Sequence, residues 1–206
     1  IRSVAVSGLM LTLMTLTPFA SAMAQGRTPE LPQEQWVKLQ EVSKVADSRD
    51  RVAAIDQFLE EHPDTPFKAN VYRLQFMSYR EFTDDDEFLW DLGQQYVAAF
   101  TVLADQMSEA YERNPILANM YSEVAIEFAN RGNHLDGALG YGMQALALMD
   151  TSAMEGSPKV SEEQWTAGIN AFRGQILKTV GWIQSQRTEY AEAETALKDA
   201  IELLPD

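Results

Sequence analysis

Cysteine is absent from this 206-residue chain, and histidine occurs only twice. The lack of cysteine excludes a disulfide framework, a thiolate metal site, a cysteine nucleophile and a lipid-modified cysteine anchor. The two histidines, His62 and His134, are far apart and outside any His-Glu-x-x-His arrangement, which excludes that metalloprotease motif. We expect both to have structural roles, His62 through a helix-dipole contact at a helix end and His134 in a turn.

Other catalytic signatures are also missing, including Gly-x-Ser-x-Gly, a phosphate-binding glycine-rich loop and Ser-x-x-Lys. The acidic run at Asp84–Glu87 lacks the glycine of a calcium loop, because Leu89 stands at the sixth position, so a solvated helix cap is favoured over a metal site. The acid pairs at 60–61 and 162–163 fall on exposed helix turns, without an apolar pocket that could raise a pKa. We therefore expect no catalytic residue, metal or cofactor.

Basic residues are scarce, with 16 Lys and Arg against 31 Asp and Glu, for a net charge of −15. This balance argues against binding to nucleic acid and to anionic lipid headgroups, both of which need a basic surface. Two interpretations of the excess acid remain open. One is solubility, and the other is an acidic groove for a basic peptide.

Runs of Val, Ile and Thr are also scarce, whereas Ala, Leu, Glu and Gln are abundant, which favours helix over sheet. With 46% hydrophobic and 23% charged residues, the composition is that of a globular protein. The four tryptophans, Trp36, Trp90, Trp165 and Trp182, are predicted to pack in the core, with a groove-lining role as the alternative.

The N-terminal 24 residues have the pattern of a signal peptide. An uncharged apolar segment from Val4 to Thr17 is followed by Pro18 and by the small-x-small motifs Ala20-Ser21-Ala22 and Ala22-Met23-Ala24. We expect export to the periplasm of a Gram-negative bacterium and cleavage, with a retained membrane anchor as the alternative. Residues 25–33, which are polar with two prolines, are predicted to be a flexible lead-in.

The C-terminal stretch has small residues at regular positions in two predicted helices. The set at positions 8, 17, 20, 24, 27 and 32 of a frame starting at Gly174 is Gly181, Tyr190, Ala193, Leu197, Ala200 and Pro205. Gly181 and Ala193 would let two helix backbones approach closely, and Pro205 would end the second helix. The spacing resembles the tetratricopeptide repeat, a helix–turn–helix unit of about 34 residues. An ordinary amphipathic hairpin is the alternative.

This resemblance implies an all-α fold in which helix–turn–helix repeats stack as an α-solenoid of about eight helices over residues 34–206. The clearest units are 51–82, 117–150 and 174–206. In the middle unit, Ile126 stands where Gly181 stands in the last. Ala200 should face the helix of a following unit. Because the chain starts at Ile1 and ends without a polar capping helix, we expect it to be a fragment, truncated at its N-terminus and also at its C-terminus.

Apolar periodicity and start signals predict the individual helices. Caps are expected at Thr65, followed by Pro66; at Asp84, as a capping box with Glu87; at Asn114, before Pro115; and at Ser161, as a capping box with Gln164. Residues 131–133 are a predicted turn and 151–160 a predicted linker. Residues 85–113 could form one long helix or two. The predicted helices are 34–46, 50–61, 65–82, 85–113, 114–130, 135–149, 161–187 and 188–204.

The resemblance further implies a non-catalytic scaffold that binds a protein or peptide in a concave groove. In the last unit the groove would be lined by Gln175, Lys178, Trp182 and Ser185. Three alternatives remain open: a spacer in an outer-membrane assembly, a helper domain of an enzyme whose catalytic part lies beyond residue 206, and self-association through an uncovered apolar helix face.

Overall fold

A computed structural model describes residues 32–107, 109–152 and 161–204, and in these ranges the chain is all-α, with eight helices and no strand. This confirms the predicted all-α class and the expected number of helices for the described part. The helices are α2 (Gln33–Ser43), α3 (Ser48–Glu61), α4 (Lys68–Tyr79), α5 (Asp86–Ala104), α6 (Ala110–Arg131), α7 (Leu135–Ser152), α8 (Glu162–Gln186) and α9 (Tyr190–Leu203). The predicted signal peptide, most of the lead-in and of the 151–160 linker, and Pro205 lie outside the described residues.

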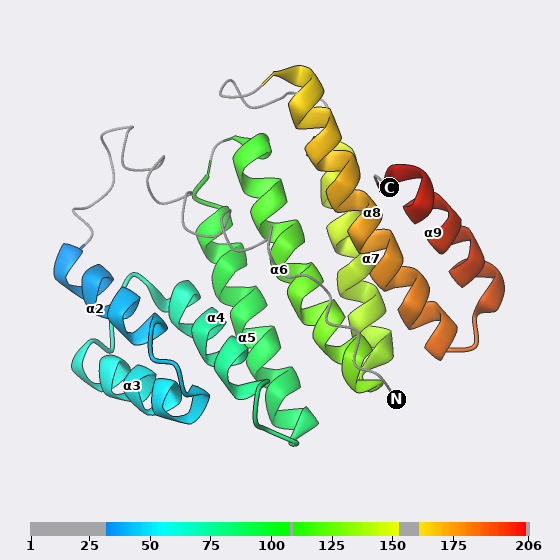
Figure 1. The fold of residues 1–206 in the computed structure, drawn as a ribbon. Coiled ribbons are helices and arrows are strands. Elements are labelled where there is room, and N and C mark those ends of the chain that lie inside the picture. Colours follow the sequence, from blue (N-terminus) through cyan, green and yellow to red (C-terminus); the bar gives the residue numbers. More distant parts are fainter. Residues whose placement is uncertain (1–31, 108, 153–160, 205–206) are drawn as a thin grey trace.

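Helices that follow each other in the chain pack against each other. Figure 1 shows α4 to α9 following one another across the molecule, with the α2–α3 pair at one end and α9 at the other. The most extensive contacts join α6 to α7 and α8 to α9, and α4 contacts α5 more extensively than it contacts α3. The buried residues form three clusters in chain order, one from α2 to α4, one mainly from α4 to α7, and one from α6 to α9. The core is therefore spread along the array of helices.

Side-chain caps start several helices, although not always at the predicted residue. The Ser161–Gln164 capping box is confirmed, with both reciprocal hydrogen bonds present. At α5 the cap is Asp85, whose carboxylate accepts from Phe88 N at 3.0 Å, so the prediction of Asp84 is wrong by one residue. At α4, Thr65 accepts from Phe67 N, but the helix begins only at Lys68, so Thr65 and Pro66 form a turn before it.

The stretch 85–113 contains two helices separated by a break. α5 ends at Ala104, and the amides of Gln106 and Met107 bond three residues back, to Leu103 and Ala104, in a tightened last turn. α6 begins at Ala110, so the predicted start at Asn114-Pro115 is wrong. Pro115 lies inside α6, where it removes one hydrogen bond in the second turn. At the other end of α6, Gly132 adopts φ 71° as the C-cap in the predicted 131–133 turn.

Small residues determine how closely α8 and α9 approach. A Cβ atom on Gly181 would lie 2.7 Å from Leu197 Cγ and 3.2 Å from the Ala193 carbonyl oxygen. A Cβ atom on Gly174 would lie 2.8 Å from Leu204 Cγ and 3.3 Å from the Ala200 carbonyl oxygen. Ala200 is 2% exposed, so it packs against α8 of its own hairpin and does not face a following unit, contrary to the expectation.

The α6–α7 hairpin has a related arrangement, shifted by one residue from the predicted alignment. Ile126 is 40% exposed, so it does not occupy a position like that of Gly181. The preceding residue, Ala125, is fully buried in one cluster with Ala138, and Ala118 is buried in a second cluster with Ala145. Both hairpins thus bury a pair of small residues spaced seven apart on each helix.

Candidate functional site

The four residues predicted to line a groove lie on one long helix, α8, and all four are exposed. Gln175, Lys178, Trp182 and Ser185 recur at intervals of three and four residues, so they share one side of the helix. Trp182 is 45% exposed, whereas the other three tryptophans are half-buried. Gly174 and Gly181 hold α8 close to α9. The four side chains form what we call the α8 face, defined by these residues.

A second exposed surface lies on α9 and was not predicted as a site. Tyr190 is 67% exposed, Leu197 37% and Ile201 73%. They stand at positions i, i+7 and i+11 of one helix, beside the buried Ala193, Ala196 and Ala200. We call these three residues the α9 outer face. The sequence contains a signal for this surface, because Ile201 belongs to a second apolar stripe on a helix whose alanines already form the buried stripe.

Acidic side chains are abundant on α9 and just before it. Within 189–202 five carboxylates accompany a single basic residue, Lys198, which bonds to Glu194 at 2.6 Å. This hydrogen bond lowers the pKa of the Glu194 carboxyl and raises that of the Lys198 ammonium. Arg187, between α8 and α9, pairs with Asp136 at the start of α7 and with Glu189. The C-terminal hairpin therefore presents apolar side chains in an acidic setting.

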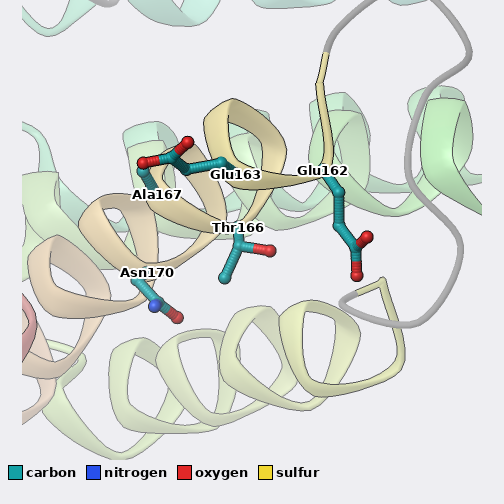
Figure 2. A pocket seen from close by; sticks show the side chains of 5 residues that line it. All are labelled: Glu162, Glu163, Thr166, Ala167 and Asn170. Carbon is teal, nitrogen blue, oxygen red and sulfur yellow. The ribbon is translucent and has the colours of Figure 1, made fainter.

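The first turns of α8 border an open hollow lined by five residues of that helix. Figure 2 shows Glu162 and Glu163 pointing in different directions, with Thr166, Ala167 and Asn170 along the helix. Both carboxylates are exposed, as the sequence predicted. Because the two acids do not converge on one point, this hollow lacks the arrangement that paired acid–base catalysis requires.

The two histidines occupy different settings. His62 is the C-cap of α3, with its amide donating to Phe58 O and its ring 5.0 Å from the Phe58 ring. His134, in the turn before α7, stacks on Trp90 with ring centroids 4.8 Å apart, and its Nε2 lies 3.3 Å from Glu87 Oε1. Trp90 also packs against Gly137, where no Cβ would fit. His134 thus helps to join α5 to the α6–α7 turn.

A partly buried polar network between α4, α5 and α6 was not predicted from the sequence. The Arg73 guanidinium donates to both carboxylate oxygens of Glu123, at 2.6 and 3.1 Å. The Tyr96 hydroxyl and the Asn119 amide donate to the same carboxylate, at 2.7 and 3.2 Å. Arg73 and Tyr96 are 50 and 27 residues from Glu123 along the chain, so no local sequence pattern marks them.

The electrostatics of this network indicate a structural role. Burial disfavours the charged form of Arg73, but the hydrogen bonds and the charge of Glu123 outweigh it and raise the guanidinium pKa above its ordinary value. Burial, with the charge of Glu123, raises the pKa of the Tyr96 phenol well above 10. All the groups have partners, so the network locks the ionised pair and the neutral phenol in place.

The described ranges contain no group of three or more His, Cys, Asp or Glu side chains that could hold a metal ion. None of their helices is both long enough and apolar enough to span a bilayer.

Comparisons with known proteins add no relative against which this site could be compared. No protein-family model matches the chain, and no match was found among curated proteins or solved structures.

Proposed function

We propose that this protein is a non-catalytic binding scaffold, a tetratricopeptide-like α-solenoid that holds a protein or peptide segment on its α8 face. The observation that carries the proposal is the exposure of Trp182, 45%, between Lys178 and Ser185 on the same side of α8. A tryptophan left in water is a strong source of binding energy once a partner covers it, and tryptophan is enriched among residues that dominate interfaces.

The repeated small-residue pairs support the solenoid part of the proposal. Gly174 and Gly181 in α8, and Ala118 and Ala125 in α6, are matched by two buried alanines seven residues apart in the following helix. Repeated hairpins of this kind stack through their sides and leave one face of each first helix for a ligand. Lys178 and Gln175 would then supply polar contacts around the Trp182 anchor.

Selection of a displayed random-peptide library on the 206-residue chain tests this function. Enriched peptides are synthesised and titrated against the parent and against Lys178→Ala and Trp182→Ala. We expect the tryptophan variant to weaken binding at least about tenfold, as for an interface hot spot. Met143→Ala is the matched control, because Met143 is 51% exposed on α7. Peptides that bind all the variants equally, or a selection that enriches none, would refute binding on the α8 face.

A further inference from the structure

α9 has two apolar stripes: one is buried, and the other is exposed except where Leu197 contacts Gly181 of α8. Ala193, Ala196 and Ala200 are buried, while Tyr190, Leu197 and Ile201 form the exposed α9 outer face. At 100° per residue these three side chains lie within about 40° of one another around the helix axis and extend over about 17 Å. No other described helix has more than two large hydrophobic side chains this exposed. Single exposed hydrophobics are ordinary on a protein surface, whereas an aligned set indicates an interaction site.

The α9 outer face is anchored to the hairpin. Leu197 lies directly over Gly181, since a Cβ on this glycine would be 2.7 Å from Leu197 Cγ. The stripe therefore continues to the edge of α8 and does not lie on a detached helix. The α8–α9 contacts are among the most extensive in the molecule, so the face is held on a firm support.

The shape of the surface selects a helical partner. All the backbone groups in the middle of α9 are bonded within the helix, so it offers no edge to which an extended strand could add. A straight apolar ridge of side chains suits a second helix that places its own apolar residues at i, i+3, i+4 and i+7 alongside it.

Charge selects the kind of helix. Residues 189–202 contain Glu189, Glu192, Glu194, Asp199 and Glu202 against Lys198, a net charge of −4. A second copy would bring an equal negative charge to this surface, and like charges across an interface are unfavourable. Lysine and arginine side chains flanking an apolar stripe would instead face carboxylates within a Debye length of about 8 Å.

We infer that the α9 outer face is a docking surface for a basic amphipathic helix of another protein. The inference rests on the proposed binding function and adds a surface distinct from the α8 face, with a partner of defined chemistry. In this inference, the excess of acidic residues in the C-terminal hairpin attracts the basic side chains of the partner helix.

The test uses two synthetic helical peptides of about 18 residues, or five turns. Both have the same leucine stripe, flanked by lysine in one and by glutamate in the other. Each is titrated calorimetrically against the 206-residue chain at about 0.15 M salt and at a lower concentration. We expect only the lysine peptide to bind, and the double substitution Tyr190→Ser with Ile201→Ser to weaken it at least about tenfold. Val102→Ser is the matched control, because Val102 is 63% exposed on α5.

Several results would overturn the inference. One is that the lysine peptide does not bind. Another is that it binds with an affinity that the serine substitutions leave unchanged, because the binding would then be a general attraction to an acidic protein. A third is a dimer of the parent chain in sedimentation that the same substitutions dissociate, because the occupant would then be a second copy. Circular dichroism and urea unfolding establish that the variants fold. Trp182→Ala separates the two proposals, since it should weaken peptide binding at the α8 face at least about tenfold and leave the affinity for the lysine peptide unchanged.

Discussion

Two regions of this molecule join helices in opposite ways. Between α4, α5 and α6 the contacts are made by large side chains, with Phe76 and Tyr96 stacked at 5.9 Å and the Arg73–Glu123 pair beside them. Between α8 and α9 the contact is made by glycine and alanine, so the backbones themselves approach. The first arrangement places the bulky residues inside. The second leaves Trp182, Tyr190 and Ile201 exposed on the surface. A hairpin packed through small residues thus keeps its large residues outside the helix–helix contact.

The largest expected effect is loss of the ion pair in the first region. Glu123→Ala leaves the Arg73 guanidinium and the Tyr96 hydroxyl without their shared acceptor. Removing one partner of a buried pair costs about 3 kcal/mol or more of unfolding free energy, and the 27% exposure of the Arg73 side chain favours the lower value. Urea unfolding measures this loss of free energy. Glu202→Ala, on the exposed side of α9, should leave the midpoint of unfolding unchanged. An equal loss of stability in both variants would show that the ion-pair network does not stabilise the fold more than an exposed carboxylate does.

The second prediction compares one substitution at two glycines of α8. Gly168 has no neighbouring atom within 4 Å of a Cβ, so Gly168→Ala should stabilise the protein by about 0.5–1 kcal/mol through helix propensity. Gly181→Ala must displace Leu197 and strain the contact with the Ala193 carbonyl, and overpacking costs about 1–3 kcal/mol. In thermal unfolding, the melting temperature of Gly168→Ala should therefore be higher than that of the parent, and the melting temperature of Gly181→Ala should be lower. Equal stabilisation would mean that α8 and α9 do not depend on close backbone approach.

The smallest effect concerns Tyr96 and pH. Because its pKa is raised on folding, the neutral phenol is favoured in the fold. Its contribution to stability is complete below the unfolded pKa of about 10 and is lost as the pH rises through the folded value. Tyr96→Phe should cost about 1 kcal/mol at neutral pH through the lost hydrogen bond to Glu123, but should make stability fall less steeply above pH ~10. Urea midpoints at neutral and alkaline pH measure both; parallel pH curves for parent and variant would contradict the assignment.

Local signals in the sequence predicted most of the helices. The Ser161–Gln164 capping box is present as expected, and α3, α7 and α9 lie within a few residues of their predicted bounds. Each of these signals acts between residues a few positions apart, where hydrogen-bond geometry is set by the backbone itself. The cap at Asp85 shows the precision of such reasoning, since three consecutive aspartates offered equivalent choices and the prediction chose the neighbour.

Long-range packing accounts for what the sequence analysis missed. Nothing local marks the break after Ala104, and Pro115, normally a signal for a helix start, is accommodated inside α6. Ile126 was aligned with Gly181 by counting, although burial shows that Ala125 is the small residue in the contact. One extra residue between the paired small positions of α6 and α7 was enough to shift the alignment.

Composition, periodicity and capping therefore predict the all-α class, the approximate helix ranges, the small residues of the last hairpin and the excess of acid, because these signals are read from the residues of one helix or from their overall balance. Which side chains contact each other and which stay exposed depends on how the helices pack. Arg73 and Glu123 are 50 residues apart and pair because α4 and α6 both pack against α5. Tyr190, Leu197 and Ile201 are exposed because α8 packs against only one side of α9. Burial is a property of neighbouring elements, and periodicity within one helix cannot say which of its two apolar stripes another helix will cover.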